Sequence, residues 1–321
     1  MMKILNLYYL VKPAIPHSLR LTLRNAIASR RRKRSSDVWP IDEAAGRTPD
    51  GWPGWPGNKR FAFVLTHDVE GTKGLDRCNL LANLEMEHGF RSSFNFVPEG
   101  QYRLPSSLRT FLLENGFEVG VHDLHHDGSL YKSRAAFVEA AGRINDYLAQ
   151  WQSVGFRSAF MFHNLDWLKD LNLLYDASTF DTDPFEPQPD GAGTIFPFWV
   201  EAANGRGYVE LPYSLAQDST MFLVLREKTN DIWKRKLNWV VEHGGMALIN
   251  VHPDYISFEG ARTRTEFPVS MYSDFLSYVT SNYGNEAWFA LPRQVAQYVK
   301  AMTHPAMASS EGQNLPAESV L

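Results

Sequence analysis

From residue 60 onward, apolar runs of strand length alternate with stretches in which hydrophobic and polar positions follow a helical pattern. Continuous apolar runs of strand length, which are typical of buried parallel strands, occupy 61–66, 92–98, 117–122, 156–162, 208–213 and 246–252. The stretches between them predict helices near 75–88, 106–115, 134–151, 164–173 and 230–243. Strands separated by single helices predict an α/β fold with a parallel sheet. Because no Gly-rich phosphate motif accompanies these repeats, the pattern favours a barrel over a dinucleotide-binding fold.

Segments of different composition flank this repeating region. Residues 36–59 are dense in Pro, Gly and Trp, which excludes a helix or a central strand and predicts a linker or a segment that wraps the domain. We therefore expect an N-terminal extension over 1–58, a catalytic barrel over 59–300, and a disordered tail over 301–321, where the residues are small and polar.

The N-terminal extension contains a strongly basic stretch. Residues 18–34, SLRLTLRNAIASRRRKR, are rich in Arg and Lys, lack acidic residues, and place Leu and Ile at roughly helical spacing. This pattern predicts a basic amphipathic helix. Such a helix could lie on anionic lipid or on an acidic partner. The alternative is a solvated helix that packs on its own barrel.

The overall composition narrows the class of protein. The chain has 321 residues, of which 44% are hydrophobic and 21% charged, which excludes a disordered chain. A net charge of −4 argues against nucleic acid as the main partner. The single cysteine, Cys78, excludes an internal disulfide. The apolar run LNLYYLV near the N-terminus is too short for a signal-peptide core or a membrane span. We therefore expect a cytoplasmic protein, with peripheral contact to the inner membrane through the basic helix as an option.

Residues with acid, base or metal-binding side chains follow three of the predicted strands. LTHDVE contains Asp68 and Glu70, VGVHDLHH contains His122 and His126, and INVHPD contains His252. In α/β barrels the carboxyl ends of the strands meet on one face and carry the chemistry. We therefore expect these side chains to form one site.

The spacing of these residues indicates a metal site. His122 and His126 would share a face in a helix or tight turn, and a carboxylate would complete a two-His, one-carboxylate set for zinc or for cobalt, nickel or iron. Asp68 and Glu70 are two apart, so on an extended chain they point the same way. One can bind the metal while the other acts as general base toward water, and His252 can protonate the leaving group. The alternative for the histidine pair is a polar loop.

Taken in chain order, these motifs resemble those of the NodB-type polysaccharide deacetylases, carbohydrate esterase family 4, over roughly residues 60–300. LTHDVE takes the place of the family's first motif, and His122 and His126 match the second. GFRSAF with Arg157 resembles the third, and ALINVH with His252 resembles the last. The resemblance implies a distorted (β/α)7 barrel that hydrolyses N-acetyl or O-acetyl groups of sugars with one divalent metal ion.

The resemblance also implies individual roles. By analogy Asp68 is the base and Glu70 the metal ligand, although the reverse assignment stays open because a glutamate is longer than the usual aspartate. Arg157 would orient the base. The third motif departs from the family at Ala159 and Met161, where proline and glycine are common, and this region would supply a backbone amide to the oxyanion.

The long stretch at 176–199 predicts a lid or substrate-binding loop because of its length. We expect Asp181 and Asp183 to contact sugar hydroxyls or to tune His252, and Trp199 to stack on a sugar face. The alternative is that the aromatic residues only seal the barrel rim.

The function expected from the sequence is a metal-dependent hydrolase that removes an acyl group, most simply N-acetyl, from a sugar or a polysaccharide-biosynthesis intermediate. The absence of a secretion signal favours a nucleotide- or lipid-linked sugar as substrate. Two alternatives are hydrolysis of another non-peptide C–N bond, in a formyl-amino sugar or a cyclic amide, and a catalytically silent sugar-binding barrel. His67, His125 and His163 have no catalytic role in this hypothesis.

Overall fold

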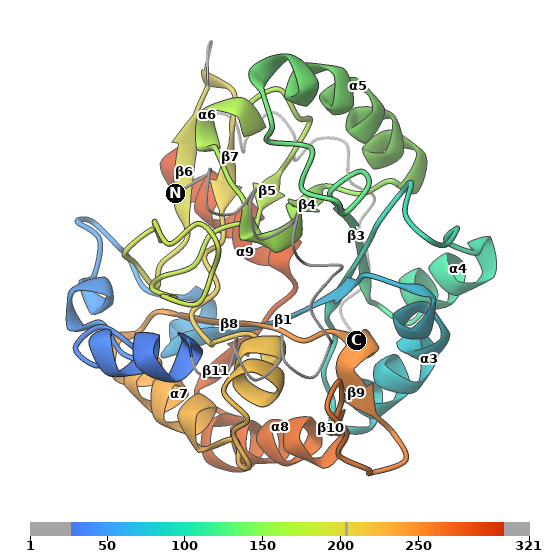
Figure 1. Cartoon of the computed structure of the whole chain (residues 1–321). Coiled ribbons are helices and arrows are strands. Elements are labelled where there is room, and N and C mark those ends of the chain that lie inside the picture. The colour runs from blue at the N-terminus through green and yellow to red at the C-terminus, as the bar shows by residue number, and fades with distance from the viewer. Residues whose placement is uncertain (1–26, 203–204, 305–321) are drawn as a thin grey trace.

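A curled, mostly parallel β-sheet lies at the centre of the molecule (Figure 1). The computed structural model describes residues 27–202 and 205–304. Within these ranges the sheet has nine strands. They are β1 (Phe61–Val69), β2 (Ser93–Phe96), β3 (Glu118–His122), β4 (Gly155–Arg157), β5 (Tyr175–Asp176), β6 (Phe198–Glu201), β7 (Gly207–Glu210), β8 (Met246–Asn250) and β11 (Ala287–Phe289). Two short strands pair with each other outside it, β9 (Ile256–Ser257) and β10 (Phe267–Pro268).

The parallel strands form a distorted barrel. They follow one another in the order β8, β1, β2, β3, β4, β5 and β7. The ring closes beyond β7, where a parallel bridge joins Leu215 to Ile249 of β8. β6 runs antiparallel to β7, and β11 pairs with the start of β1. The predicted α/β architecture, a distorted (β/α)7 barrel, is therefore confirmed.

Most of the helices surround this barrel, whereas the last one lies behind its centre (Figure 1) and packs toward its interior through Val295, Ala296 and Val299. The helices are α3 (Thr72–Glu87), α4 (Ser106–Glu114), α5 (Arg134–Trp151), α6 (Leu165–Leu168), α7 (Asp231–His243), α8 (Ser270–Tyr283) and α9 (Pro292–Thr303). Single helical turns occur at η2 (Glu43–Gly46), η3 (Pro56–Asn58), η4 (Ala159–Met161), η6 (Ser219–Val224) and η7 (Pro253–Tyr255). The helix predicted over 134–151 has the same ends in the structure, because Ser133 caps its first turn and Gln152 ends it in the left-handed region.

One predicted strand is mostly wrong. The apolar run 156–162 forms strand only up to Arg157. Phe160 and Met161 then adopt positive φ angles of 56° and 54°, which turn the chain away from the sheet. The carboxylate of Asp123 accepts a hydrogen bond from the Ala159 amide at 3.2 Å and so anchors this turn.

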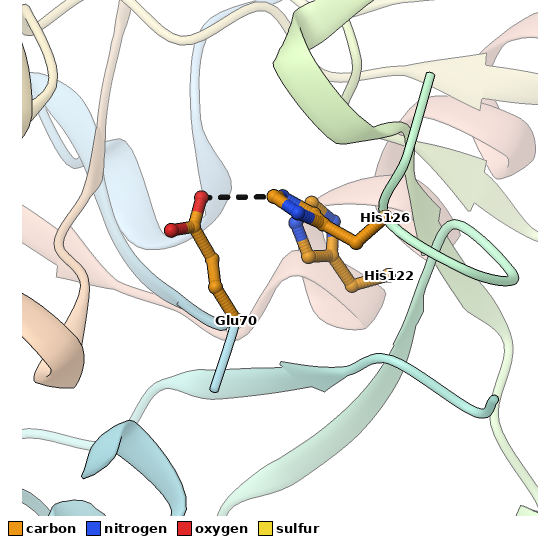
Figure 2. Close-up of side chains that lie close together, drawn as sticks. All are labelled: Glu70, His122 and His126. Carbon is orange, nitrogen blue, oxygen red and sulfur yellow. Dashed lines mark ion pairs between the residues drawn. The ribbon is translucent and has the colours of Figure 1, made fainter. Parts of the chain in front are cut away.

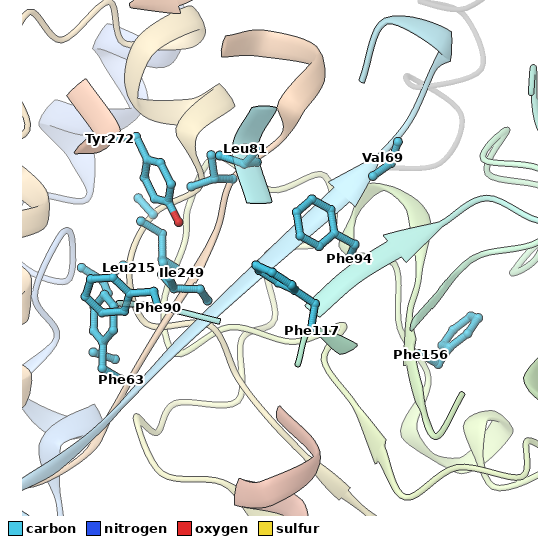
Figure 3. Close-up of a cluster of buried hydrophobic side chains, with 14 of the residues drawn as sticks. Phe63, Val69, Leu81, Phe90, Phe94, Phe117, Phe156, Leu215, Ile249 and Tyr272 are labelled. Carbon is cyan, nitrogen blue, oxygen red and sulfur yellow. The ribbon is translucent and has the colours of Figure 1, made fainter. Parts of the chain in front are cut away.

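The side chains of β1 alternate between two hydrophobic clusters, and this alternation decides which side chains at the end of the strand face the barrel interior. Phe63 and Val69 pack in the larger cluster toward the helices (Figure 3), together with Leu65, whereas Ala62 and Val64 pack inside the barrel. Burial of each large side chain stabilises the fold by about 1.5–3 kcal/mol. Because the alternation has period two, the even-numbered positions at the end of β1 face the barrel interior.

The N-terminal extension wraps the barrel instead of hanging free as a linker. The Trp55 indole donates a hydrogen bond to the Gly244 carbonyl at 2.8 Å, and the Ile195 amide donates to the Ala45 carbonyl at 3.0 Å. Of the predicted basic helix, residues 27–34 are described and are helical. Its earlier part lies outside the described residues, as do 305–321 of the predicted tail. Residues 301–303 of that predicted tail instead belong to α9.

Within the described ranges, no helix combines the length and the apolar character that a membrane crossing requires.

Candidate active site

The carboxyl ends of β1 and β3 bring three potential metal ligands together. Glu70 directly follows β1, His122 ends β3, and His126 lies in the loop after β3 (Figure 2). One ligand atom from each of them lies within 4.8 Å of the other two. The Glu70 Oε1 and His126 Nε2 atoms are 3.2 Å apart. The structure therefore brings together the three residues that the sequence predicted as metal ligands.

The loop after β3 is a tight turn rather than a helix. Asp123 and His126 both have φ of 56°, a region that a non-glycine residue occupies at a cost of about 1–3 kcal/mol. The Asp123 carboxylate holds the turn by accepting hydrogen bonds from the amides of Leu124 and Ala159. As a result the rings of His122 and His126 lie 4.9 Å apart between their centroids.

The nitrogen atoms of this pair fit a metal ion. His122 Nδ1 lies 3.0 Å from the Arg157 carbonyl, which fixes the proton on Nδ1 and leaves the Nε2 lone pair directed at the site. Both Nε2 atoms are buried; that of His122 has no hydrogen-bond partner among the described residues, and that of His126 faces Glu70 Oε1. Two imidazole nitrogens and one carboxylate are a donor set for zinc and similar divalent ions. His125 points elsewhere, with its Nδ1 at 3.3 Å from the Glu99 carbonyl.

Asp68 lies beside this cluster inside the barrel and is almost fully buried. Its Oδ1 accepts from Asn95 Nδ2 at 2.9 Å and lies 3.4 Å from Arg157 Nη1, and its Oδ2 accepts from Asn250 Nδ2 at 2.8 Å. Burial alone would raise the pKa of Asp68, but the charges of His122, Arg157 and His252 outweigh it and hold this pKa well below its usual range. Asp68 is thus a carboxylate at neutral pH.

Arg157 is held rigidly at the end of β4. Its Nε donates to the Ala177 carbonyl at 2.7 Å, and its Nη1 donates to the Thr66 hydroxyl at 2.8 Å. The whole side chain is buried. It therefore places a fixed positive charge against Asp68.

Sequence analysis missed the partner of His252. The Asp218 carboxylate lies 2.6 Å from His252 Nδ1 and accepts the His252 backbone amide at 2.8 Å. Burial lowers the pKa of His252, but Asp218 and, more weakly, Glu70 and Asp68 raise it to about 10. Asp218 comes just after Leu215, the residue that closes the barrel against β8, and no signal in the sequence marks this position.

These groups share one cavity of about 680 Å³. Asp68, Glu70, His122, His126 and His252 all line it. It is large enough for a sugar with an acyl substituent, within the usual range of 300–1,000 Å³ for ligand pockets. The sequence-predicted metal ligands, base and acid are therefore exposed to the same space.

The three residues predicted to bind substrate do not line this cavity, which corrects that prediction. Asp181 is buried in an ion pair with Lys236 of α7, at 2.5 Å between Oδ2 and Nζ. Asp183 accepts from the Tyr213 hydroxyl at 2.9 Å. Trp199 lies on β6, where its ring packs 4.6 Å from that of His304. The residues of the long loop that do reach the cavity are Phe185, Glu186 and Pro187.

We predict that Asp181→Asn lowers stability without lowering activity per folded molecule. Removing one partner leaves the Lys236 ammonium buried without its counter-charge, which typically costs about 3–5 kcal/mol. Chemical denaturation measures the decrease in the free energy of unfolding. A variant of unchanged stability with impaired turnover would contradict the structural role and return Asp181 to the substrate site.

Glu186 belongs to a buried group of acids that shares a proton. The Tyr213 hydroxyl lies 2.8 Å from Glu186 Oε1 and 2.9 Å from Asp183 Oδ2. A hydroxyl has one proton, so one of the two carboxyl groups must supply the other. Burial and repulsion from Asp183 raise the pKa of Glu186 to about 8, and burial and repulsion from Asp181 raise that of Asp183 to about 6. Gln217 links Glu186 to Asn250, which contacts Asp68.

The raised pKa of Glu186 predicts a pH dependence of stability. Because its folded pKa is about 8 and its ordinary value is 4.5, the folded state binds more protons than the unfolded state between these values. The free energy of unfolding should therefore fall as pH rises from 5 to 8, by up to about 1.4 kcal/mol per pH unit for one proton. Glu186→Gln should remove this slope in denaturation measured across the range. Parallel pH profiles for the two proteins would disprove the shared proton.

Comparison with known proteins supports the fold. No protein-family model matches the sequence, and no curated protein matches it. Among solved structures, a protein of Mycobacterium smegmatis provisionally described as a polysaccharide deacetylase is similar over 85% of this chain and 98% of its own, with a TM-score of 0.60 and 18% identity. A peptidoglycan deacetylase from Bacillus subtilis is similar over 80% of this chain and 98% of its own, with a TM-score of 0.45 and 11% identity. The chain therefore has the fold of the polysaccharide deacetylases, the group that its sequence motifs resemble.

Proposed function

We propose that this protein is a metal-dependent hydrolase that removes an acyl group, most simply N-acetyl, from a sugar or a polysaccharide-biosynthesis intermediate. The observation that carries the proposal is the convergence of a two-His, one-carboxylate set with a buried carboxylate and a paired histidine on one cavity. A likeness in fold to deacetylases is consistent with it.

Glu70, His122 and His126 would hold the ion. The Glu70 carboxylate is fixed by the Tyr255 hydroxyl on Oε2, which leaves Oε1 directed at the histidines. Both oxygens of Asp68 already accept hydrogen bonds from amide side chains, which favours Glu70 over Asp68 as the ligand. When bound at such a site, a divalent ion such as zinc acidifies water and polarises a carbonyl oxygen.

Asp68 is our candidate for the general base. It is ionised, it lines the cavity, and its Oδ2 lies 4.0 Å from His122 Nε2, next to the metal ligands. Asn95, Asn250 and Arg157 hold the carboxylate in one orientation, so it can take a proton from water without first reorganising.

His252 is our candidate for the general acid. Its Nδ1 is held by Asp218, so its Nε2 faces the cavity, at 3.8 Å from Glu70 Oε1. The Asp218 charge keeps the ring protonated at neutral pH, as donation to a leaving amine or alkoxide requires. Phe160 and Met161, in the turn after β4, also line the cavity, and we assign the oxyanion donor to the backbone of this turn.

A substrate panel tests the proposal. Acyl release is measured from N-acetylated sugar oligomers, from formyl-amino sugars and from cyclic amides, with the purified protein loaded with zinc or cobalt. We expect acetate from the acetylated sugars. Turnover of only the other two classes would redirect the proposal to a different C–N bond. Sugar binding without any turnover would replace it with a sugar-binding barrel.

A further inference from the structure

The outer part of the cavity has a different chemistry from its floor. The floor carries the acids and histidines described above, whereas the outer lining includes three cations, Arg31, Lys73 and Arg264. Ile27 and Phe160 also line it, and 57% and 39% of their surfaces are exposed. These two side chains place exposed apolar surface beside the cations.

The cations are not neutralised by the carboxylates of the site. Among the described residues, Arg31 donates only to the Pro184 carbonyl, at 2.7 Å, which leaves most of its N–H groups available. Arg264 is exposed and forms no hydrogen bond or ion pair within the described part of the chain. Lys73 shares the Glu266 carboxylate with Arg77, at 2.7 Å from each, so this group of three keeps one positive charge.

The acids that line the same cavity have hydrogen-bond partners of their own. The Asp254 carboxylate is occupied by the backbone amides of Glu70, Gly71 and Gly74 at 3.0 to 3.1 Å. The proton shared by Glu186 and Asp183 leaves that pair with a single negative charge near Arg31. The outer lining therefore combines three basic side chains with exposed apolar ones.

The helical segment 27–34 contributes to both properties. Ile27, Ala28 and Arg31 of this segment line the cavity. The five residues from Arg30 to Arg34 are all basic, and Arg32 fixes the segment to the barrel through an ion pair with Glu227 at 2.5 Å. A basic run of this kind is attracted to an anionic membrane surface.

We propose that the acylated sugar is carried on a lipid phosphate. The inference rests on the proposed function and names its substrate class: the sugar enters the floor of the cavity, its phosphate meets Arg31 and Arg264, and the hydrocarbon chain contacts Ile27 and Phe160. Arginine is suited to a phosphate because its planar N–H groups can bind two oxygens at once. Aliphatic side chains such as Ile27 and Leu223 match a hydrocarbon chain better than a nucleobase.

The test uses binding rather than turnover. Isothermal titration calorimetry compares decyl phosphate, below its micelle concentration, with uridine diphosphate and inorganic phosphate. The variant Arg31→Gln/Arg264→Gln removes two cavity cations. The matched control Arg30→Gln/Arg235→Gln removes two exposed cations that do not line the cavity.

We expect decyl phosphate to bind at least about tenfold more tightly than the other two ligands. The cavity variant should weaken this binding by about tenfold or more, as expected for the loss of charge-assisted contacts, while the control leaves it unchanged. Tightest binding of uridine diphosphate would overturn the lipid in favour of a nucleotide carrier. Equal binding by both variants would overturn the site itself.

The lipid-phosphate inference and the proposed hydrolase function can fail independently of each other. If acetate is released from N-acetylated sugars but decyl phosphate does not bind, only the lipid-phosphate inference fails. If decyl phosphate binds through Arg31 and Arg264 but no acylated sugar is hydrolysed, the hydrolase proposal fails.

Discussion

Asp68→Asn should lower kcat for acyl release by about 10²- to 10⁴-fold, the contribution typical of a positioned general base, and should leave the metal content unchanged. The amide keeps the size of the carboxylate but cannot accept a proton. Asn95, Asn250 and Arg157 all donate to this position, so the new amide group also meets donors, and some stability will be lost. Kinetics and elemental analysis on the same preparation separate the two effects.

Asp181→Asn is the matched control, since it makes the same change at a buried aspartate that lies outside the cavity. It should keep its turnover per folded molecule. If Asp68→Asn instead loses the metal ion together with activity, Asp68 is the ligand and Glu70 the base. That result would reverse the assignment that the hydrogen bonds favour.

Asp218→Asn should impair the acid step. Asp218 raises the pKa of His252 to about 10, so replacing its carboxylate lowers that pKa, and the protonated ring is lost at lower pH. We expect kcat on an N-acetylated sugar to fall by about 10²-fold and the alkaline limb of the pH profile to move to lower pH. An acetyl ester with a good leaving group, such as a nitrophenyl ester, needs no acid and should lose far less.

Asp274→Asn, an exposed aspartate on α8, controls for the loss of one negative charge. Equal losses on the amide and on the activated ester would contradict the role of Asp218, because a defect in folding or metal binding would affect both substrates alike. Melting temperatures of the two variants distinguish such a defect directly.

Local pattern was sufficient to predict the fold and the centre of the site. The β1 sequence begins with an apolar run, and its period-two geometry directs Asp68 into the barrel while Val69 faces the helices. His122 ends a strand and His126 follows it by four residues, so one short segment brings both to the same place. These features depend on a few neighbouring residues and on the rule that parallel strands end on one face.

Features set by long-range contacts could not be predicted in this way. Asp181, Asp183 and Asp218 are all acids in the region between β5 and β8, and nothing in their immediate neighbours distinguishes them. Which of these acids contacts His252 depends on the ion pair that holds Asp181 to Lys236 and on the bridge that brings the chain before Asp218 beside β8. The proton shared around Tyr213 likewise requires side chains from distant segments.

The central claim is that Glu70, His122 and His126 bind a divalent ion, and elemental analysis of the purified protein tests it most directly. The wild type and His125→Ala should each contain one zinc or similar ion per chain after equilibration with the metal and removal of excess, and His122→Ala/His126→Ala should contain none. A wild type without metal, or a double variant that retains it with correct folding, would contradict the account.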